Sequence, residues 1–332
     1  MGDIQKHIKI ALFDAKAYDK IWFDEYKSKY NIDILYIENK LTSGTAGLAN
    51  GCNGVIAFVN DIIDEAVINT LVSIGIEIVA MRCAGYNNVD LCYASGKLII
   101  VTVPAYSPNS VAEYAIALLF TLNRKIHRAY MRTKEFDFSI NGLLGFEMCN
   151  KTVGVVGTGR IGRAFINICR GIGMNVIAFD PNHSESDIKY VSFDELCANS
   201  DIISLHCPLT KETYHIINKD SFTQMKDGIV IINTSRGALI DAEELITAIK
   251  THKVGGAALD VYEEERTLFY EDFSDTVIQD DVIARLLSMP NVIVTSHQAF
   301  LTKEALENIA NTTLSNLSLF FKGVIQNEVK SK

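Results

Sequence analysis

Short runs of apolar residues alternate along the chain with longer segments in which apolar residues recur every three or four positions. A short apolar run between turn residues is typical of a strand that is buried on both faces of a sheet, whereas the longer period is typical of an amphipathic helix. Regular alternation of the two predicts an α/β protein whose parallel sheets are built from β-α-β units.

The apolar runs form two series, and each series predicts one sheet. The first series comprises residues 8–13, 32–37, 55–58, 76–81 and 98–101, with helical segments such as 21–29 and 64–74 between them. The second series comprises residues 153–157, 176–180, 202–206, 229–233, 257–260 and 292–295. We therefore expect two doubly wound parallel-sheet, Rossmann-like domains with a ligand-binding cleft between them.

Two further helices are predicted from their end signals. Ser110 and Glu113 have the spacing of a capping box, and apolar residues then continue at helical spacing to Ile126, which predicts a long helix. Another amphipathic helix is expected over residues 302–322, with Gly323 as its C-terminal stop. Residues 103–108, just before the first of these helices, hold two of the five prolines and predict a domain boundary.

Composition excludes several classes of function. With 332 residues, of which 48% are hydrophobic, the chain has enough apolar material for two cores. A net charge of −9 offers no basic stripe for nucleic acid, and no apolar stretch is long enough to span a membrane. Seven cysteines without a C-x-x-C pair suggest neither a disulfide framework nor a metal site. With no signal peptide recognisable at the N-terminus, a cytoplasmic protein is expected.

A G-x-G-x-x-G motif made by Gly157, Gly159 and Gly162 directly follows an apolar run. In a dinucleotide site the first glycine permits a tight turn, the second lets the backbone approach a pyrophosphate, and the third allows the helix to pack closely on the sheet. The amides and the dipole at the start of that helix favour phosphate binding. The motif therefore predicts a nucleotide site.

Asp180 ends the next apolar run, eighteen positions after Gly162. A carboxylate there accepts hydrogen bonds from the ribose hydroxyls and repels a 2′-phosphate, which favours NAD over NADP. The alternative is that Asp180 is only a turn or N-cap aspartate before Pro181.

Three charged side chains follow strands of the second series. Arg236 offers a planar fork for a carboxylate, and Glu265 and His297 come after the two last apolar runs. A nicotinamide dehydrogenase that acts on 2-oxo acids needs such a cation, an acid for the carbonyl oxygen and a partner for that acid.

Each of these residues also has an ordinary structural interpretation. Arg236 alone would usually be a surface arginine, and the run 263–265 would be a solvated acidic loop. His206 also follows a strand, so on position alone it competes with His297 for the catalytic role.

Together with the glycine motif and Asp180, these residues give the chain a family resemblance. From about residue 8 to residue 322 it resembles the NAD-dependent D-2-hydroxyacid dehydrogenases, and in particular their bacterial fermentative D-lactate branch. The stretches that carry the similarity are 81–90, 104–108, 204–210 and 297–302, and the stretch 265–272 points to the lactate branch. The resemblance implies a flavodoxin-like substrate (catalytic) domain of residues 1–103 and 300–332 and an NAD-binding Rossmann domain of residues 104–299.

The resemblance also implies a function and a set of contacts. Arg236 would anchor the carboxylate of pyruvate or D-lactate, His297 would be the acid–base group and Glu265 its partner, while the backbone of Ala84 and Gly85 would also bind the substrate carboxylate. The implied NAD contacts are Gly157, Gly159, Arg160, Ile161, Gly162, Asp180, Cys207, Pro208, Thr213, Thr234, Ser235, Arg236 and Asp260.

Several alternatives stay open. Tyr106 and Phe300 either shape the substrate pocket or belong to the core. The substrate is either pyruvate or a bulkier 2-oxo acid, because one methylene in an apolar pocket changes binding by only about 1–3 kcal/mol. A regulatory protein that senses NAD on the same fold is a further possibility. A homodimer or homotetramer is expected from the relatives.

Overall fold

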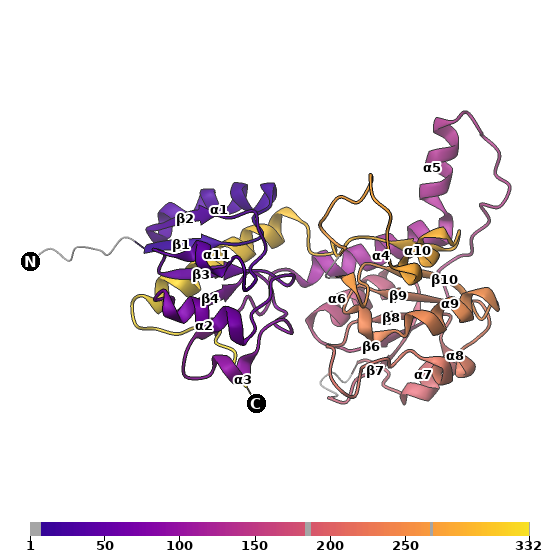
Figure 1. The fold of residues 1–332 in the computed structure, drawn as a ribbon. Coiled ribbons are helices and arrows are strands. Elements are labelled where there is room, and N and C mark those ends of the chain that lie inside the picture. The colour runs from indigo at the N-terminus through magenta and orange to yellow at the C-terminus, as the bar shows by residue number, and fades with distance from the viewer. Residues whose placement is uncertain (1–7, 183–186, 266–267, 332) are drawn as a thin grey trace, which may run out of the picture. The chain divides into compact units, whose positions relative to one another are not determined.

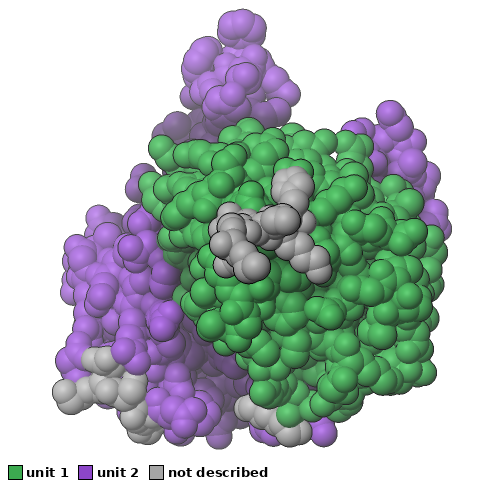
Figure 2. Space-filling view, turned by 90° about the vertical axis from the view of Figure 1, so that its left-hand side faces the viewer, with its two compact units in different colours: residues 1–107, 301–332 green, residues 108–300 purple. Residues whose placement is uncertain are grey.

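The computed structural model describes residues 8–182, 187–265 and 268–331, and the chain folds into two compact units (Figures 1 and 2). Unit 1 comprises residues 1–107 and 301–332, and unit 2 comprises residues 108–300. Each unit contains one parallel sheet flanked by helices. The prediction of two α/β domains with parallel sheets is confirmed.

Unit 1 has a five-stranded parallel sheet in the order β2-β1-β3-β4-β5. The strands are β1 (Ile8–Leu12), β2 (Ile32–Tyr36), β3 (Gly54–Ala57), β4 (Ile78–Met81) and β5 (Ile99–Val101). Helix α1 (Ala17–Tyr30) packs against α11 (Lys303–Phe320), and α2 (Glu65–Ser73) packs against α3 (Leu91–Ala94) and a 3-10 turn, η1 (Ala46–Ala49). This strand order is that of flavodoxin-like folds.

Unit 2 has a six-stranded parallel sheet in the order β11-β10-β9-β8-β6-β7. Its strands are β6 (Thr152–Val156), β7 (Asn175–Phe179), β8 (Ile202–Leu205), β9 (Ile229–Asn233), β10 (Val254–Leu259) and β11 (Val292–Val294). An isolated parallel bridge between Ala178 and Tyr190 extends the sheet beyond β7. The strand order reverses between β6 and β8, and sheets of this kind bind ligands at such a point.

The helices of unit 2 cover both faces of its sheet (Figure 1). Helices α4 (Pro108–Arg124) and α6 (Arg160–Gly171) share one core cluster with the sheet. The other face is covered by α7 (Phe193–Asn199), α8 (Lys219–Gln224), α9 (Ala242–Lys250) and α10 (Asp281–Ser288). In β9, Ile229 and Ile231 lie in this second cluster, whereas Val230 and Ile232 lie in the first. Burial on both faces explains why a strand such as β9 is apolar at four consecutive positions, from Ile229 to Ile232.

The long helix predicted from Ser110 to Ile126 is wrong in two respects. It begins at Pro108, because proline is tolerated in the first turn where its missing N–H costs nothing. It ends at Arg124, because Lys125 adopts a left-handed conformation with φ 50° and ψ 38°. A separate helix, α5 (Ile126–Lys134), follows and stands out from the rest of unit 2 (Figure 1). Ile126 is exposed, so it gains no burial that would favour continuing α4.

We call residues 126–147, which comprise α5 and the loop after it, the arm. Its exposed large apolar side chains are Ile126, Tyr130, Met131, Phe136, Phe138, Ile140, Leu144 and Phe146. Monomeric proteins seldom expose so many large apolar groups in one segment. Within the residues that the structure describes, no helix is long and apolar enough to cross a membrane.

Candidate active site

The predicted site residues of unit 2 follow its strands at one edge of the sheet. The glycine motif follows β6, Asp180 follows β7, Cys207 follows β8, Thr234 to Arg236 follow β9, Asp260 follows β10 and His297 follows β11. Because all six strands are parallel, their carboxyl ends meet at the same edge. The fold therefore gathers residues that are separated by up to about 140 positions in the sequence.

Two of the three motif glycines are required by close packing. Gly157 has φ +93°, and a methyl group on it would lie 2.7 Å from the His206 carbonyl group. A methyl group on Gly162 would collide with the carbonyl oxygen of Gly157. Gly159 is different, because nothing lies within 4 Å of the place where its side chain would be. The backbone at Gly159 is therefore open to the approach of a ligand.

Gly159 is the N-cap of α6, and it provides no side chain to cap the helix. Arg160 and Ile161 form the first turn, in which backbone N–H groups lack partners within the helix. These amides and the positive end of the helix dipole can bind a pyrophosphate. The loop thus fits the phosphates of a dinucleotide.

Asp180 is bound to the glycine-rich loop. Its Oδ2 accepts hydrogen bonds from Thr158 N (2.7 Å) and Thr158 Oγ1 (3.0 Å), and its Oδ1 accepts one from Asn182 N (2.8 Å). Oδ1 therefore makes the turn contact that was the alternative interpretation of Asp180. Oδ2 instead holds the glycine-rich loop, on which the dinucleotide would lie. The sequence analysis did not identify Thr158 as a site residue. Its position between Gly157 and Gly159 is the one feature of the sequence that could have indicated its contact with Asp180.

His206 is excluded as the acid–base residue. Its side chain is buried, its Nε2 lies 2.9 Å from Ser204 Oγ, and its ring packs against Phe165. Burial lowers the pKa of His206 to about 3, so the imidazole is neutral near pH 7. Such a histidine supports the turn at Gly157 rather than delivering a proton.

The loop after β8 presents Cys207 and Pro208. Burial raises the pKa of the Cys207 thiol to about 11, so it is an uncharged group. Thr213 folds back on this loop, because its hydroxyl donates to Pro208 O (2.7 Å) and accepts from Thr210 N (2.7 Å). Cys207 and Thr213 therefore lie on the loop after β8, where they can contact a bound cofactor.

The turn after β9 is held by its own side chains. Asn233 Nδ2 donates to Arg236 O (2.8 Å), and Ser235 Oγ donates to Leu205 O (2.8 Å) on β8. The Arg236 guanidinium is half-buried and donates to Ser235 O (2.6 Å). Thr234 Oγ1 is buried and has no hydrogen-bond partner among the described residues. A buried hydroxyl of this kind is available to a bound polar group.

His297 and Glu265 form a direct pair. His297 Nδ1 lies 2.7 Å from Glu265 Oε1, and each side chain is 17% exposed. The second oxygen of Glu265 accepts a hydrogen bond from Tyr262 N (3.0 Å), which fixes the carboxylate plane. The pair uses Nδ1, so it leaves Nε2 as the ring atom that can exchange a proton with a ligand.

Asp260 organises the loop that carries His297. It is fully buried; its Oδ1 accepts from Thr295 Oγ1 (2.6 Å) and Gln298 N (2.9 Å), and its Oδ2 accepts from Ala299 N (2.8 Å). Its carbonyl oxygen accepts from His297 N (2.7 Å), and burial raises the pKa of its carboxyl group. The sequence suggested Asp260 as a cofactor contact only; its contacts with the loop were missed, since nothing local signals them.

The remaining predicted residues lie elsewhere in the fold. Ala84 and Gly85 follow β4 in unit 1. Tyr106 is half-buried in unit 1, where its carbonyl accepts a hydrogen bond from Asn308 Nδ2 (2.8 Å). Phe300, the last residue of unit 2, is buried.

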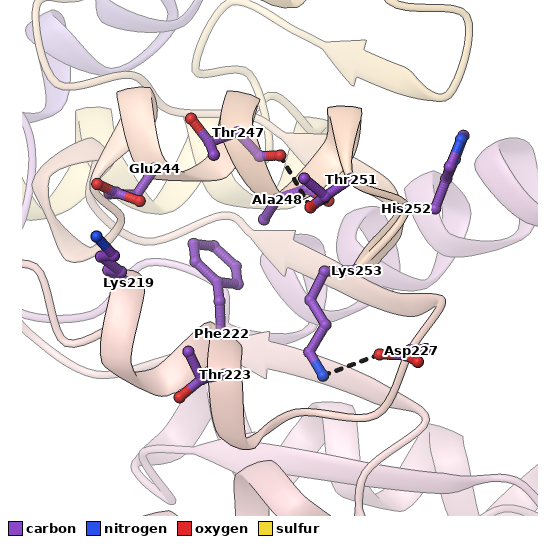
Figure 3. A pocket seen from close by; sticks show the side chains of 10 residues that line it. All are labelled: Lys219, Phe222, Thr223, Asp227, Glu244, Thr247, Ala248, Thr251, His252 and Lys253. Carbon is purple, nitrogen blue, oxygen red and sulfur yellow. Dashed lines mark hydrogen bonds and ion pairs between the residues drawn. The ribbon is translucent and has the colours of Figure 1, made fainter.

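A pocket of about 470 Å³ lies at a different place in unit 2, between α8 and α9 (Figure 3). Asp227, which pairs with Lys253 (2.9 Å), precedes β9, and Lys253 itself precedes β10. The pocket is therefore at the amino edge of the sheet, and none of the predicted site residues lines it. No group of three His, Cys, Asp or Glu side chains within the described ranges could hold a metal ion.

Residues 116–299 match the family model described as D-isomer specific 2-hydroxyacid dehydrogenase, NAD binding domain. The chain is 50% identical over 321 residues to the D-lactate dehydrogenase of Escherichia coli (strain K12), a match that covers 95% of this chain and 98% of that protein. The apo-structure of D-lactate dehydrogenase from Escherichia coli matches with a TM-score of 0.89 and 46% identity, over 97% of this chain and 100% of that chain. The structure of D-lactate dehydrogenase with NAD+ from Lactobacillus jensenii matches with a TM-score of 0.81 and 31% identity, over 98% and 100% of the two chains.

Proposed function

The chain belongs to the family of D-isomer specific 2-hydroxyacid dehydrogenases, and we propose that it is a D-lactate dehydrogenase that reduces pyruvate reversibly with NADH. Membership confirms the predicted resemblance, and the predicted cofactor NAD is confirmed with it. The observation that carries the proposal is the 2.7 Å contact between His297 and Glu265 at the sheet edge that also holds the dinucleotide loop. Similarity to a D-lactate dehydrogenase over nearly the whole chain favours lactate among the family's substrates.

The residues of unit 2 fit NAD at three places. The open backbone at Gly159 suits the pyrophosphate, the Asp180 carboxylate suits the adenosine ribose, and the unpartnered Thr234 hydroxyl can bind a polar group of the cofactor. Bound there, NADH supplies the hydride that reduces C2 of a 2-oxo acid.

Arg236 and His297 would handle the substrate. The guanidinium of Arg236 binds the carboxylate of pyruvate and so orients its carbonyl group, and the amides of Ala84 and Gly85 remain proposed contacts of the same carboxylate. His297 donates the proton from Nε2 to the carbonyl oxygen as C2 is reduced, and it takes that proton back from the hydroxyl of D-lactate in the reverse direction. Glu265 holds the ring by Nδ1, so that Nε2 faces the reacting oxygen and the imidazolium has a counter-charge. Tyr106 and Phe300 are proposed to shape the pocket around the methyl group.

The proposal is tested by NADH oxidation with pyruvate, 2-oxoisocaproate and phenylpyruvate, and by chiral analysis of the product. The highest kcat/KM is expected for pyruvate, with D-lactate as the product. A higher value for a bulkier acid would indicate another dehydrogenase of the family. NADH binding without turnover of any 2-oxo acid would favour the regulatory alternative.

We further propose that the protein is a cytoplasmic, fermentative enzyme and that a second copy of the chain covers the arm. All seven cysteines are free, as is usual in a reducing compartment. Phe136, Ile140 and Leu144 are each more than 80% exposed, and burying them against another copy would remove this apolar surface from water. Light scattering should give a dimer or tetramer, and Ile140→Glu combined with Leu144→Glu should shift it towards the monomer.

A further inference from the structure

Glu265 and Tyr270 both contact His297, and we propose that Tyr270 is a positioning residue for the acid–base histidine. Glu265 holds the side chain of His297, and Tyr270 holds its backbone. The inference rests on the proposed function, because it assigns Tyr270 a part in the same proton transfer.

Tyr270 contacts His297 in two ways. Its hydroxyl donates a hydrogen bond to the His297 carbonyl oxygen (2.8 Å). Its ring lies near the imidazole, with 6.5 Å between the ring centroids and an angle of 29° between the ring planes. Glu265 and Tyr270 together therefore reach the histidine at Nδ1, at the carbonyl oxygen and along the ring.

The backbone of His297 needs such support, because its φ is +50°. This left-handed conformation is unfavourable for residues other than glycine and persists only where the surroundings hold it. Asp260 holds the loop through His297 N, Gln298 N and Ala299 N. The contact that fixes the carbonyl group of His297 itself comes from Tyr270. If that contact is lost, the peptide between His297 and Gln298 is held only at its N–H by Asp260, so the carbonyl side can shift and the imidazole can move with it.

Tyr270 is itself well anchored. Its neighbour Phe269 is buried in the core of unit 2, and the amide of Phe269 donates to Glu265 O (2.8 Å). The amide of Leu268 donates to the same carbonyl oxygen (3.0 Å). Leu268 and Phe269 are thereby bound to Glu265, and Phe269 also to the core, so the hydroxyl of Tyr270 is presented from a fixed position.

The test removes one oxygen atom. In Tyr270→Phe the ring remains and the hydrogen bond to His297 is lost, so kcat for pyruvate should fall about fivefold, as expected for one net hydrogen bond. KM for pyruvate and Kd for NADH should stay within about twofold, because Arg236 and the dinucleotide loop are untouched. Rates are expressed per NADH-binding site, so that a loss of folded protein does not count as a loss of catalysis.

Tyr30→Phe is the matched control. Tyr30 lies in unit 1, and its hydroxyl donates to Asn311 Oδ1 (2.7 Å), so the same atom and a comparable hydrogen bond are removed far along the chain from His297. This variant should keep the parental kcat. An equal fall of kcat in both variants, or a kcat within about 1.5-fold of the parent in Tyr270→Phe, would overturn the assignment.

A second measurement does not depend on turnover. In the ligand-free protein with labelled histidine, the imidazole NMR signal of His297, assigned with His297→Gln, should shift or broaden in Tyr270→Phe and stay in place in Tyr30→Phe. An unmoved signal in Tyr270→Phe would contradict the inference. If the parent protein reduces no 2-oxo acid at all, the proposed function fails, and this signal still decides whether Tyr270 orders His297.

Discussion

The two sheets carry arginines at corresponding places, but the surroundings of those arginines differ. Arg82 follows β4 and Arg236 follows β9, and each of these strands is second in line from the first strand of its sheet. Arg82 is 2% exposed: it donates to Asp14 O (2.9 Å), pairs with Asp19 (3.2 Å) and lies over the Phe58 ring at 4.0 Å. Arg236 is half-buried and donates to the carbonyl of its own neighbour, Ser235.

The same contrast separates two histidines of unit 2. His206 is buried and neutral beneath the glycine loop, whereas His297 is partly exposed and paired with a carboxylate. Removing an ionisable group that is enclosed by protein contacts leaves its buried partners unsatisfied, whereas a group that is held but still accessible can act on a ligand. Substitutions should therefore damage stability at Arg82 and His206, and catalysis at Arg236 and His297.

Arg236→Lys should lower kcat/KM for pyruvate by at least ~3 kcal/mol, or more than about 100-fold, because an ammonium group cannot form the bidentate contact with a carboxylate. The melting temperature and Kd for NADH should change little. Pyruvate turnover within a few fold of the parent would show that Arg236 is not the carboxylate anchor.

Arg82→Met should have the opposite profile. It leaves Asp19 buried without its charged partner, so the free energy of unfolding should fall by about 3 kcal/mol in a urea titration. Among the molecules that stay folded, kcat per NADH-binding site should remain near that of the parent. If Arg82→Met loses turnover but keeps its stability, Arg82 acts in catalysis as Arg236 does, and the proposed difference between the two arginines is wrong.

Stability should decrease as the pH falls below about 6.5, partly because of His206. The pKa of His206 is about 3 in the folded protein, so the unfolded chain takes up a proton between pH 6.5 and 3 that the folded chain does not. The resulting loss of unfolding free energy is small above pH 6.5 and reaches about 2 kcal/mol at pH 5. His206→Gln should lose less unfolding free energy than the parent between pH 7 and pH 5, and equal losses would contradict the assignment.

Asp180→Ala should reduce the preference for NADH over NADPH about tenfold, because the ribose contact and the repulsion of a 2′-phosphate disappear together. The ratio of the two kcat/KM values measures this. Thr158→Val is a useful companion, since it removes one of the two hydrogen bonds to Asp180 Oδ2 and keeps the carboxylate. If the ratio of kcat/KM for NADH to kcat/KM for NADPH is unchanged in Asp180→Ala, Asp180 does not select the cofactor and only stabilises the turn.

The strands and the ends of α11 could be predicted from the sequence, because they depend on residues that are close together in the chain. Short apolar runs identified each strand in the described part of the chain, because most of these parallel strands are buried on both faces. The edge strand β2 is an exception, since its positions alternate between buried or partly buried and exposed. Thr302 caps α11 through its contact with Ala305 N (3.3 Å), and Gly323 follows the helix with φ +83°, both as their residue types suggest. Arg236, Glu265 and His297 were notable in the sequence as charged residues that follow strands, and the resemblance assigned each of them its role.

What could not be predicted depends on contacts between distant segments. The enclosure of Arg82 joins the ends of β1, β3 and β4, and no short pattern reports it. The left-handed backbone at Lys125 and His297 is set by the surrounding structure, and neither residue type alone signals it in the sequence. Tyr270 lay in a stretch that was notable only for its similarity to the lactate branch, and its bond to His297 emerged only from the fold.

A double-mutant cycle on kcat for pyruvate reduction decides whether Glu265 and His297 act as one unit in proton transfer. His297→Gln should lower kcat by about 10³-fold, and Glu265→Gln should lower it substantially but less. Because the glutamate acts through the histidine, the double variant should be no slower than His297→Gln alone. If the two losses multiply in the double variant, the residues act independently and the account of the pair is wrong.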